Sequence, residues 1–252
     1  MRPNFLVCGL EHTGTTLISD LFRQIPNLDS GFECGVLLCE SPEAFQDYQP
    51  FADNMLGGWG ITEDQFADCC SSKSFDQFYE KLFKASTVLE EGTAEFFDKT
   101  PRYLAQLSRV LERCDAPVII SYKDPRAIVC SDFKRAKTDD FAGWYEQYVK
   151  GKLRYASNCY AQYVEHKDDP RVAIIGLEDL AMNARATMER MFAHVGQAFR
   201  LEYSIIETLR YENVKNHTVS ADIAFEYKRI LSKDAQSKIR EDFAHLDAWF
   251  YD

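Results

Sequence analysis

The hydrophobic residues of this chain follow two patterns: short unbroken apolar runs, and longer stretches in which apolar residues recur every three or four positions. The unbroken runs are typical of short strands buried on both faces, and they cover residues 5–9, 118–122 and 172–175. The stretches with the helical period follow these runs and cover residues 15–24, 126–137 and 140–167. Strands that alternate with helices predict an α/β fold, with three α/β/α layers around a central, mostly parallel sheet.

Residues that favour helix ends flank several of these stretches. Asp124 and Pro125 are a typical N-cap and first helical residue. Ser74 and Gln77 have the spacing of a capping box ahead of a helix whose aromatic stripe is typical of a core-facing side. Pro26 ends the first helical stretch. These local signals agree with the helical period.

We expect a single domain over residues 1–252, because no linker-like run divides the chain and α/β domains often reach this length; two domains are the weaker alternative. Residues 41–72 mix aromatic and acidic residues around a Gly-Gly-Trp-Gly turn without a sustained period. They fit either a lid over a site or an irregular insertion. Residues 211–252 are expected to form a tail, with a polar segment followed by a last helix that docks on the body.

Charge and cysteine content narrow the function classes. The net charge of −11 argues against nucleic acid as a partner, so an anionic ligand needs a local basic patch. The eight cysteines include no CxxC pair, which argues against a metal site, and Cys8 and Cys130 lie in apolar runs typical of reduced core residues. No apolar run is long enough to span a membrane, and the glycine-rich turn at Gly9 leaves no room for a signal peptide. These features predict a cytoplasmic protein without a transmembrane segment.

The first apolar run leads into the sequence GLEHTGTT, residues 9–16. Gly9, Gly14 and Thr16 fit the Walker A spacing of a P-loop, but Thr15 occupies the position of its lysine. A glycine-rich turn that leads into a helix holds a phosphate through backbone N–H groups and the helix dipole, and threonine hydroxyls add donors. Without the lysine, phosphoryl transfer becomes less favoured than binding of a phosphate that is already activated.

Polar residues also follow the second and third apolar runs. Because the carboxyl ends of parallel strands meet at one edge of the sheet, residues 123–126 and the pair Glu178 and Asp179 should lie near the loop. Lys123 at a strand end and Ser131 two helical turns later can converge on a second phosphate. Arg126 has two expected roles, in the same anion site or in a pair with Asp124.

Four segments, in the same order along the chain, resemble the sulfotransferase family. GLEHTGTTLISDLF resembles the loop that binds the 5′-phosphosulfate, and VIISYKDPRAIVCSDF resembles the 3′-phosphate motif, with Lys123 in place of its arginine and Ser131 at the usual spacing of eight. FFDKTPRYL and GLEDL resemble two segments of bacterial and carbohydrate-type members. The resemblance covers roughly residues 4 to 195.

The resemblance implies a donor with phosphates at both ends of a nucleoside, 3′-phosphoadenosine 5′-phosphosulfate (PAPS). It implies transfer of the sulfonate group to a hydroxyl or amine of a small-molecule, carbohydrate or lipid acceptor, with release of 3′,5′-ADP (PAP) and no metal. The residues expected to bind the donor are Glu11, His12, Thr13, Gly14, Thr15, Thr16, Lys123, Arg126 and Ser131. Neither the acceptor's identity nor the oligomeric state leaves a recognisable pattern in the sequence.

Three residues are expected to be catalytic: Lys99, Glu33 and His12. Lys99 follows a predicted strand through Phe96 and Phe97, and it is expected to reach the transferring sulfonate rather than only to pair with Asp98. A glutamate after the first helix is expected to be the base, with Glu33 as first choice and Glu40 as second.

His12 stands where the family has arginine or lysine. We hypothesise that the anionic donor keeps its imidazole protonated, so that His12 stabilises the leaving group. Two alternatives remain at this point: a P-loop-type nucleotide or small-molecule kinase, and a catalytically impaired family member that binds PAP or PAPS.

Overall fold

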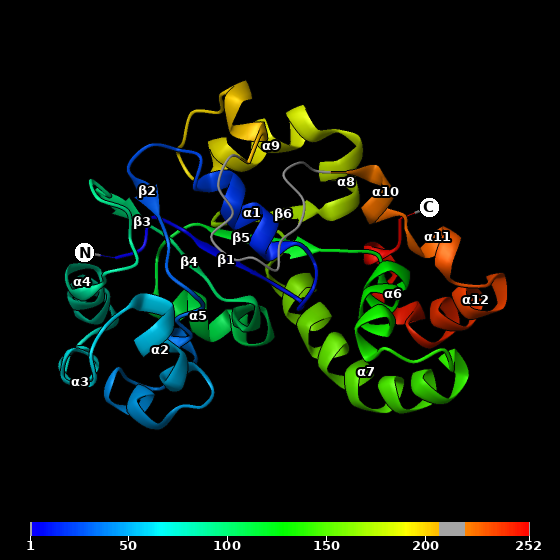
Figure 1. The fold of residues 1–252 in the computed structure, drawn as a ribbon, viewed down its shortest axis with the longest axis horizontal. Coiled ribbons are helices and arrows are strands. Elements are labelled where there is room, and N and C mark those ends of the chain that lie inside the picture. The colour runs from blue at the N-terminus through cyan, green and yellow to red at the C-terminus, as the bar shows by residue number, and fades with distance from the viewer. Residues whose placement is uncertain (1, 207–219, 252) are drawn as a thin grey trace.

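The computed structural model describes residues 2–206 and 220–251 (Figure 1). Its central sheet has the strand order β4-β1-β5-β6, and every neighbouring pair is parallel. The strands are β1 (Leu6–Gly9), β4 (Asp98–Lys99), β5 (Val118–Tyr122) and β6 (Val172–Gly176). A second parallel pair joins β2 (Leu28–Asp29) to β3 (Glu95–Phe96). The predicted α/β fold around a mostly parallel sheet is confirmed.

Alternate residues of the central strands pack into two different hydrophobic clusters, one on each face of the sheet. Leu6 and Ile120 lie in one cluster, and Val7, Ile119 and Ile175 lie in the other. Three helices contribute to the second cluster: α1 (Thr15–Phe22), α8 (Leu177–Met182) and α9 (Ala184–His194). Among the helices that contribute to the first cluster are α5 (Leu107–Arg113) and the long helix α7 (Phe141–His166). Helices on both faces produce the predicted three layers (Figure 1).

Most of the remaining helical segments contribute buried side chains to the same two clusters. In chain order they are η1 (Val36–Leu38), η2 (Glu43–Asp47), α2 (Phe51–Trp59), α3 (Glu63–Cys70), α4 (Phe75–Ala85), η3 (Pro101–Gln106), α6 (Pro125–Ala136), η4 (Leu201–Ser204), α10 (Ala221–Ala224), α11 (Tyr227–Ile230), α12 (Lys233–Asp242) and η5 (Ala244–Trp249). As predicted, Asp124 caps α6 by accepting from the Arg126 N–H. The Ser74 side chain caps α4 by accepting from the Gln77 N–H, but the Gln77 side chain accepts from the Lys73 N–H, so the expected capping box is only half formed.

Residues 41–72, whose sequence shows no sustained period, contain η2, α2 and α3. The glycines that obscure the pattern permit close packing: a Cβ on Gly58 would lie 2.6 Å from the Cβ of Phe32. The Phe32 N–H also donates to the Gly58 carbonyl. Helix α2 therefore supports the stretch that carries Glu33.

Two expected elements differ from the structure. The strand expected through Phe96 and Phe97 is divided, because the chain leaves β2 after Phe96 and joins β1 at Asp98. The last helix expected in the tail is also divided, into α12 and η5. Residues 211–219 of the tail lie outside the described residues.

The sequence predicts reduced core cysteines and no transmembrane segment. All eight cysteines, Cys8 and Cys130 included, are buried and free. Among the residues that the structure describes, no helix is both long and apolar enough to cross a membrane.

A buried carboxylate joins β4 to the helices beside it. Asp98 accepts hydrogen bonds from the hydroxyls of Tyr79 and Tyr103, at 2.7 Å each, and from the Thr100 hydroxyl at 2.8 Å. Burial raises the pKa of Asp98, although these donors favour its ionised form. The carboxylate is therefore the acceptor around which three buried hydroxyls are arranged.

We expect Asp98→Ala to lower the free energy of unfolding by about 4 kcal/mol, because it leaves buried hydroxyls without an acceptor. Tyr103→Phe removes one donor and should cost about 1 kcal/mol. Urea unfolding of the two variants measures both effects. Equal losses would contradict the central role of the carboxylate.

Candidate functional site

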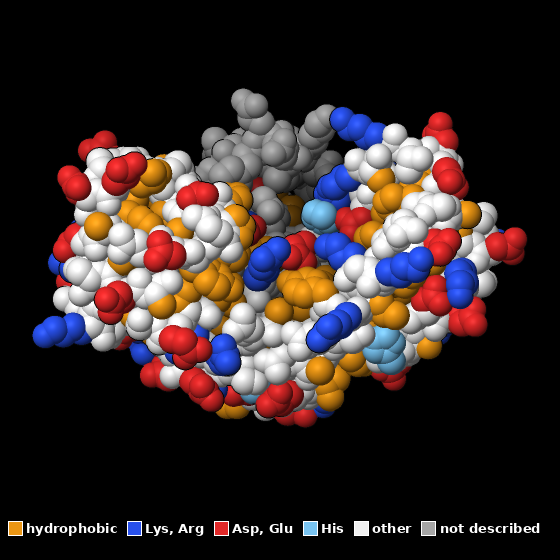
Figure 2. All heavy atoms as spheres, turned by 90° about the horizontal axis from the view of Figure 1, so that it is seen from below, with side chains coloured by type: hydrophobic (Ala, Val, Ile, Leu, Met, Phe, Trp, Pro, Cys, Tyr) orange, Lys and Arg blue, Asp and Glu red, His pale blue; other side chains and the backbone are white. Residues whose placement is uncertain are grey.

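The predicted polar clusters meet at the carboxyl edge of the sheet. Viewed from below, this side of the molecule is hollowed between two lobes (Figure 2). A histidine and both acidic and basic side chains gather around the hollow, between apolar walls (Figure 2). Within residues 2–206 and 220–251, no group of three or more His, Cys, Asp or Glu side chains could hold a metal ion.

The loop between β1 and α1 is fastened to the neighbouring strand β5. The Thr13 hydroxyl donates to the Leu10 carbonyl at 2.6 Å and to the Ser121 carbonyl at 3.1 Å, and the Ser121 hydroxyl donates to the Thr13 carbonyl. A side chain at Gly9 would collide with the Ser121 carbonyl, so only glycine allows this approach. Thr13 is fully buried, and its hydroxyl shapes the loop.

Gly14 ends the loop in a left-handed conformation, with φ of 92°, immediately before α1. Thr15 and Thr16 are the first two residues of that helix. The N–H groups of a first helical turn have no partner within the helix and point toward its amino end, where the dipole is positive. The start of α1 can therefore hold an anion without a lysine.

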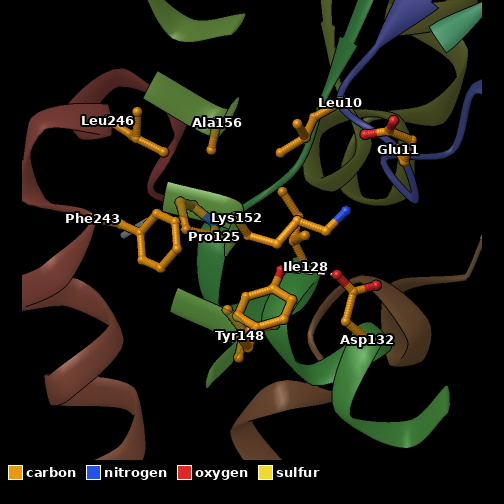
Figure 3. A pocket seen from close by; sticks show the side chains of 11 residues that line it. Leu10, Glu11, Pro125, Ile128, Asp132, Tyr148, Lys152, Ala156, Phe243 and Leu246 are labelled. Carbon is orange, nitrogen blue, oxygen red and sulfur yellow. Dashed lines mark hydrogen bonds between the residues drawn. The ribbon is translucent and has the colours of Figure 1, made fainter. Parts of the chain in front are cut away.

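His12 also has a positive φ, 69°, and its side chain leaves the loop toward α6. Its Nδ1 forms a very short contact with Asp132 Oδ1, and Tyr148 of α7 donates from its hydroxyl to Asp132 Oδ2 at 2.8 Å. Beside this contact lies a pocket, lined by Leu10, Glu11, Pro125, Ile128, Val129, Asp132, Tyr148, Lys152, Ala156, Phe243 and Leu246 (Figure 3). Its polar side chains gather at one end, where the Lys152 amino group points toward Glu11 and Asp132 (Figure 3).

Glu11 is held on the outer side of the loop. Its Oε1 accepts from the Tyr155 hydroxyl at 3.2 Å and from Arg102 Nε at 3.4 Å. Its side chain is 25% exposed. Glu11 thus fixes the loop to η3 and α7.

The residues expected to form the second anion site lie together beside the first turns of α6. Lys123 Nζ donates to Ser131 Oγ at 3.0 Å, and Lys123 is only 3% exposed. This hydrogen bond joins the ammonium group to a neutral hydroxyl and not to a carboxylate. Burial lowers the pKa of Lys123, and the nearby Glu178 acts in the opposite direction. A buried cation without a paired anion is costly, so this position favours an anionic ligand.

Arg126 lies next to this site but is engaged elsewhere. Its guanidinium donates to both Asp124 oxygens, with Nη2 2.6 Å from Oδ2, and to the Tyr251 carbonyl at 2.9 Å. It also lies over the ring of Tyr227, 4.9 Å from the ring centre. Of the two roles expected for Arg126, the pair with Asp124 is the one observed here.

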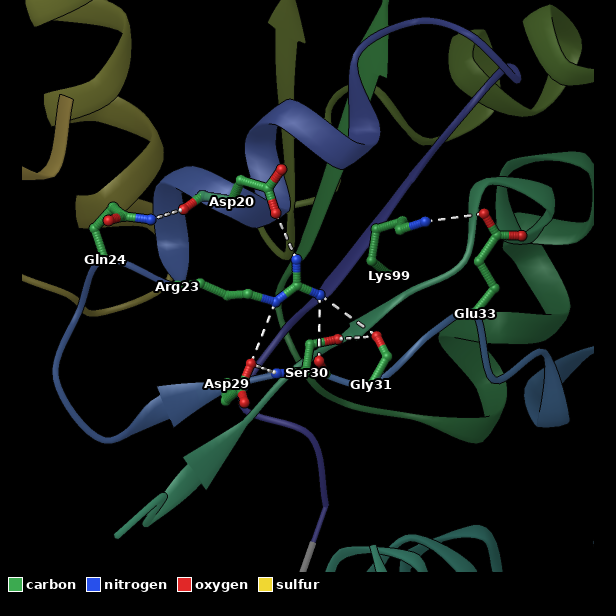
Figure 4. A network of polar contacts seen from close by, with 8 residues as sticks. All are labelled: Asp20, Arg23, Gln24, Asp29, Ser30, Gly31, Glu33 and Lys99. Carbon is green, nitrogen blue, oxygen red and sulfur yellow. Dashed lines mark hydrogen bonds and ion pairs between the residues drawn. The ribbon is translucent and has the colours of Figure 1, made fainter. Parts of the chain in front are cut away.

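Lys99 and Glu33 form the third part of the site. Lys99 Nζ donates to Glu33 Oε1 at 2.9 Å, and the lysine is 2% exposed (Figure 4). Lys99 pairs in register with Val7 of β1, two residues before the loop begins. The Lys99 side chain forms its ion pair with Glu33 and not with Asp98, because the Asp98 carboxylate accepts hydrogen bonds from the two tyrosine hydroxyls.

The backbone around Glu33 is held from both sides. The Cys34 N–H donates to Asp98 and the Gly35 N–H donates to the Thr100 hydroxyl, which fixes the stretch to β4. On the other side, Arg23, the residue that follows α1, donates to the Ser30 carbonyl at 3.2 Å (Figure 4). The end of the first helix thus holds the segment that carries Glu33.

Arg23 itself is clamped between two carboxylates. It contacts Asp20 at 2.7 Å and Asp29 at 3.2 Å, and its side chain is 8% exposed (Figure 4). Glu40, by contrast, is 76% exposed and pairs with Arg109 and Arg113 of α5. Only Glu33 of the two candidate bases contacts Lys99.

No sequence pattern indicates Asp132 or Arg23 as site residues. His12 and Asp132 are 120 positions apart, and no local pattern links them. Arg23 lies in a helical stretch, where a charged residue is normally a surface residue.

Glu178 is a buried carboxyl beside the second anion site. Its Oε1 accepts from the Asp124 N–H at 3.0 Å, and its Oε2 is buried without a hydrogen-bond partner among the described residues. Burial raises the pKa of Glu178 to about 7.

This raised pKa predicts a pH-dependent stability. In the folded protein the Glu178 carboxyl stays protonated up to about pH 7, whereas its ordinary pKa is 4.5. The resulting stabilisation of the folded state is therefore complete below about pH 4.5 and is lost as pH rises toward 7. Glu178→Gln should remove this part of the decline, which amounts to about 3 kcal/mol at most. Denaturant titrations between these pH values measure it, with Asp179→Asn as the matched control. A Glu178→Gln variant with the pH dependence of the wild type would contradict this assignment.

Comparisons with known proteins agree with this geometry. The family model described as "Sulfotransferase family" matches residues 3–200. The sulfotransferase domain of the Synechococcus PCC 7002 olefin synthase has a TM-score of 0.71 at 16% identity, over 100% of this chain and 96% of that chain. The sulfotransferase domain from the curacin biosynthetic pathway has a TM-score of 0.62 at 13% identity, over 98% of each chain.

A mouse sulfotransferase in complex with PAP has a TM-score of 0.57 at 13% identity, over 97% of this chain and 84% of that chain. No curated protein matches the sequence. At these identities the structural likeness concerns the fold, whereas the family model matches most of the sequence itself. This chain therefore belongs to the sulfotransferase family.

Proposed function

We propose that this protein transfers the sulfonate group of PAPS to a hydroxyl or amine of a small-molecule, carbohydrate or lipid acceptor, and releases PAP. One observation carries the proposal: three groups suited to an anionic donor lie together at the carboxyl edge of one sheet. They are the amino end of α1, the Lys123–Ser131 contact and the Lys99–Glu33 pair. A donor with phosphates at both ends of a nucleoside requires two such sites.

In this proposal the two ends of the donor bind to separate segments. The 5′-phosphosulfate would lie against the loop and the first turn of α1, formed by Gly14, Thr15 and Thr16. The 3′-phosphate would bind Lys123 and Ser131, whose side chains already lie within hydrogen-bond distance. The buried charge of Lys123 supports this role, because a phosphate supplies the missing anion.

The Lys99–Glu33 pair would carry the transfer itself. The acceptor oxygen or nitrogen attacks sulfur, and the bond between sulfur and the bridging phosphate oxygen breaks, leaving its electron pair on the phosphate of PAP. Glu33 takes the proton of the acceptor, and Lys99 stabilises negative charge on the sulfonate oxygens. The 2.9 Å contact between them supports this division, because it holds the carboxylate and the ammonium group at the same point of the site.

Ligand-dependent stabilisation distinguishes this function from a kinase of the P-loop type. We expect PAP to raise the melting temperature in the absence of magnesium, whereas ATP with magnesium should have a much smaller effect. Transfer of labelled sulfate from PAPS to a panel of alcohols and amines then tests the enzyme. Stabilisation by ATP with magnesium alone would contradict the proposal, and PAP binding without any transfer would indicate a binding protein.

A second prediction concerns the base. Glu33→Gln should lower kcat at least 100-fold, because general-base catalysis typically contributes a factor of about 10² to 10⁴. PAP affinity should be retained, since Glu33 lies outside the two anion sites. Glu40→Gln is the matched control and should keep wild-type activity. A fully active Glu33→Gln enzyme would rule out this base.

A further inference from the structure

The His12 side chain is held through one nitrogen only. Nδ1 contacts Asp132, while no residue in the described part of the chain lies within hydrogen-bond distance of Nε2. The imidazole is 37% exposed and Asp132 only 10%. His12 therefore presents Nε2 outward from the loop, and Asp132 anchors the ring from behind.

We propose that Asp132, itself held by Tyr148, is the positioning residue that makes His12 a substitute for the arginine or lysine of the loop. This inference rests on the proposed sulfotransfer. A carboxylate that accepts the Nδ1–H fixes the orientation of a histidine ring and stabilises its imidazolium form. The imidazolium then donates its Nε2–H toward the bridging oxygen on which negative charge develops.

The surroundings of Asp132 favour this role. Its Oδ2 accepts from the Tyr148 hydroxyl at 2.8 Å, so both carboxylate oxygens have a partner. Burial alone would favour the protonated acid, but His12 and Tyr148 hold the pKa of Asp132 below its usual value. The rest of the pocket beside Asp132 is lined largely by apolar side chains, such as Ile128 (Figure 3).

Other charged groups face the pair from three elements. They are Arg135 on α6, 3.7 Å from Asp132, Lys152 on α7, and Glu11 in the loop, which pairs with Arg102 of η3. Lys152 and Arg135 lie on the Asp132 side and keep that carboxylate ionised. Without Asp132 these cations would oppose a protonated His12, so the carboxylate is the group on which the imidazolium depends.

Two roles of a carboxylate–histidine pair predict opposite pH profiles. A protonated His12 that stabilises the leaving group gives activity that falls as pH rises, because deprotonation removes the cation. A His12 acting as general base gives activity that rises with pH. Because the donor is anionic and Glu33 already serves as base, we assign the first role.

The test is a pH profile of kcat for Asp132→Asn. We expect kcat to fall about tenfold at neutral pH, with the decline at high pH beginning at lower pH than in the wild type. The KM for PAPS should change little. Tyr148→Phe should produce a smaller change in the same direction. The matched control is Asp242→Asn, which removes another carboxylate bonded to a tyrosine of α7 and should leave the profile unchanged.

The His12→Arg background separates positioning from general destabilisation. An arginine is always charged, so His12→Arg should flatten the decline at high pH, and adding Asp132→Asn should then change the profile little. An unaltered profile for Asp132→Asn would overturn the inference. So would a loss confined to the low-pH side, or a His12→Ala enzyme of undiminished rate.

Nuclear magnetic resonance of labelled histidines tests the pair without turnover. In the free protein, neutral His12 should carry its proton on Nδ1, and Asp132→Ala should abolish this preference, with His12→Gln assigning the signal. Identical His12 signals in these proteins would overturn the inference. Absence of sulfate transfer by the wild type would instead refute the proposed function.

Discussion

The arrangement of the site depends on the contact between the loop of residues 9–14 and strand β5. Gly9 approaches the Ser121 carbonyl where no side chain would fit, and Thr13 and Ser121 exchange hydrogen bonds between hydroxyls and carbonyls. This contact places the amino end of α1 beside the end of β5, and Lys123 follows Ser121 by two residues. The two anion sites are therefore set apart by the spacing of neighbouring strands, which is a fixed property of a sheet.

An acidic protein builds this anion site by burying single cations rather than by a basic surface. Lys99 and Lys123 are each nearly inaccessible, and each has a different neighbour: a carboxylate for the first, a hydroxyl for the second. In the proposed mechanism Lys99 exchanges its contact with Glu33 for one with the sulfonate, and the ammonium group of Lys123 binds the phosphate. The chain's negative charge thus leaves the local chemistry unaffected, because electrostatic interactions within a buried site outweigh screened charges on the surface.

Much of the fold was predictable because its signals are local. The apolar runs, the Asp124 cap and the spacing of Lys123 and Ser131 each depend on neighbouring residues, and the structure reproduces them. The helices within residues 41–72 were not predicted, since glycines needed for close packing interrupt the helical period. The pairs that complete the site join residues 66 and 120 positions apart, Glu33 with Lys99 and His12 with Asp132. The resemblance pointed to Glu33, Lys99 and His12 singly, but only the folded sheet brings the partners together, so no sequence pattern identifies the pairings.

We propose that one edge of the sheet binds both phosphates of a nucleoside bisphosphate. A crystal structure of the protein with PAP tests this arrangement. We predict the 5′-phosphate at the loop and the first turn of α1, and the 3′-phosphate within hydrogen-bond distance of Lys123 Nζ and Ser131 Oγ. PAP bound with its 3′-phosphate elsewhere, and Lys123 still directed only to Ser131, would contradict the account.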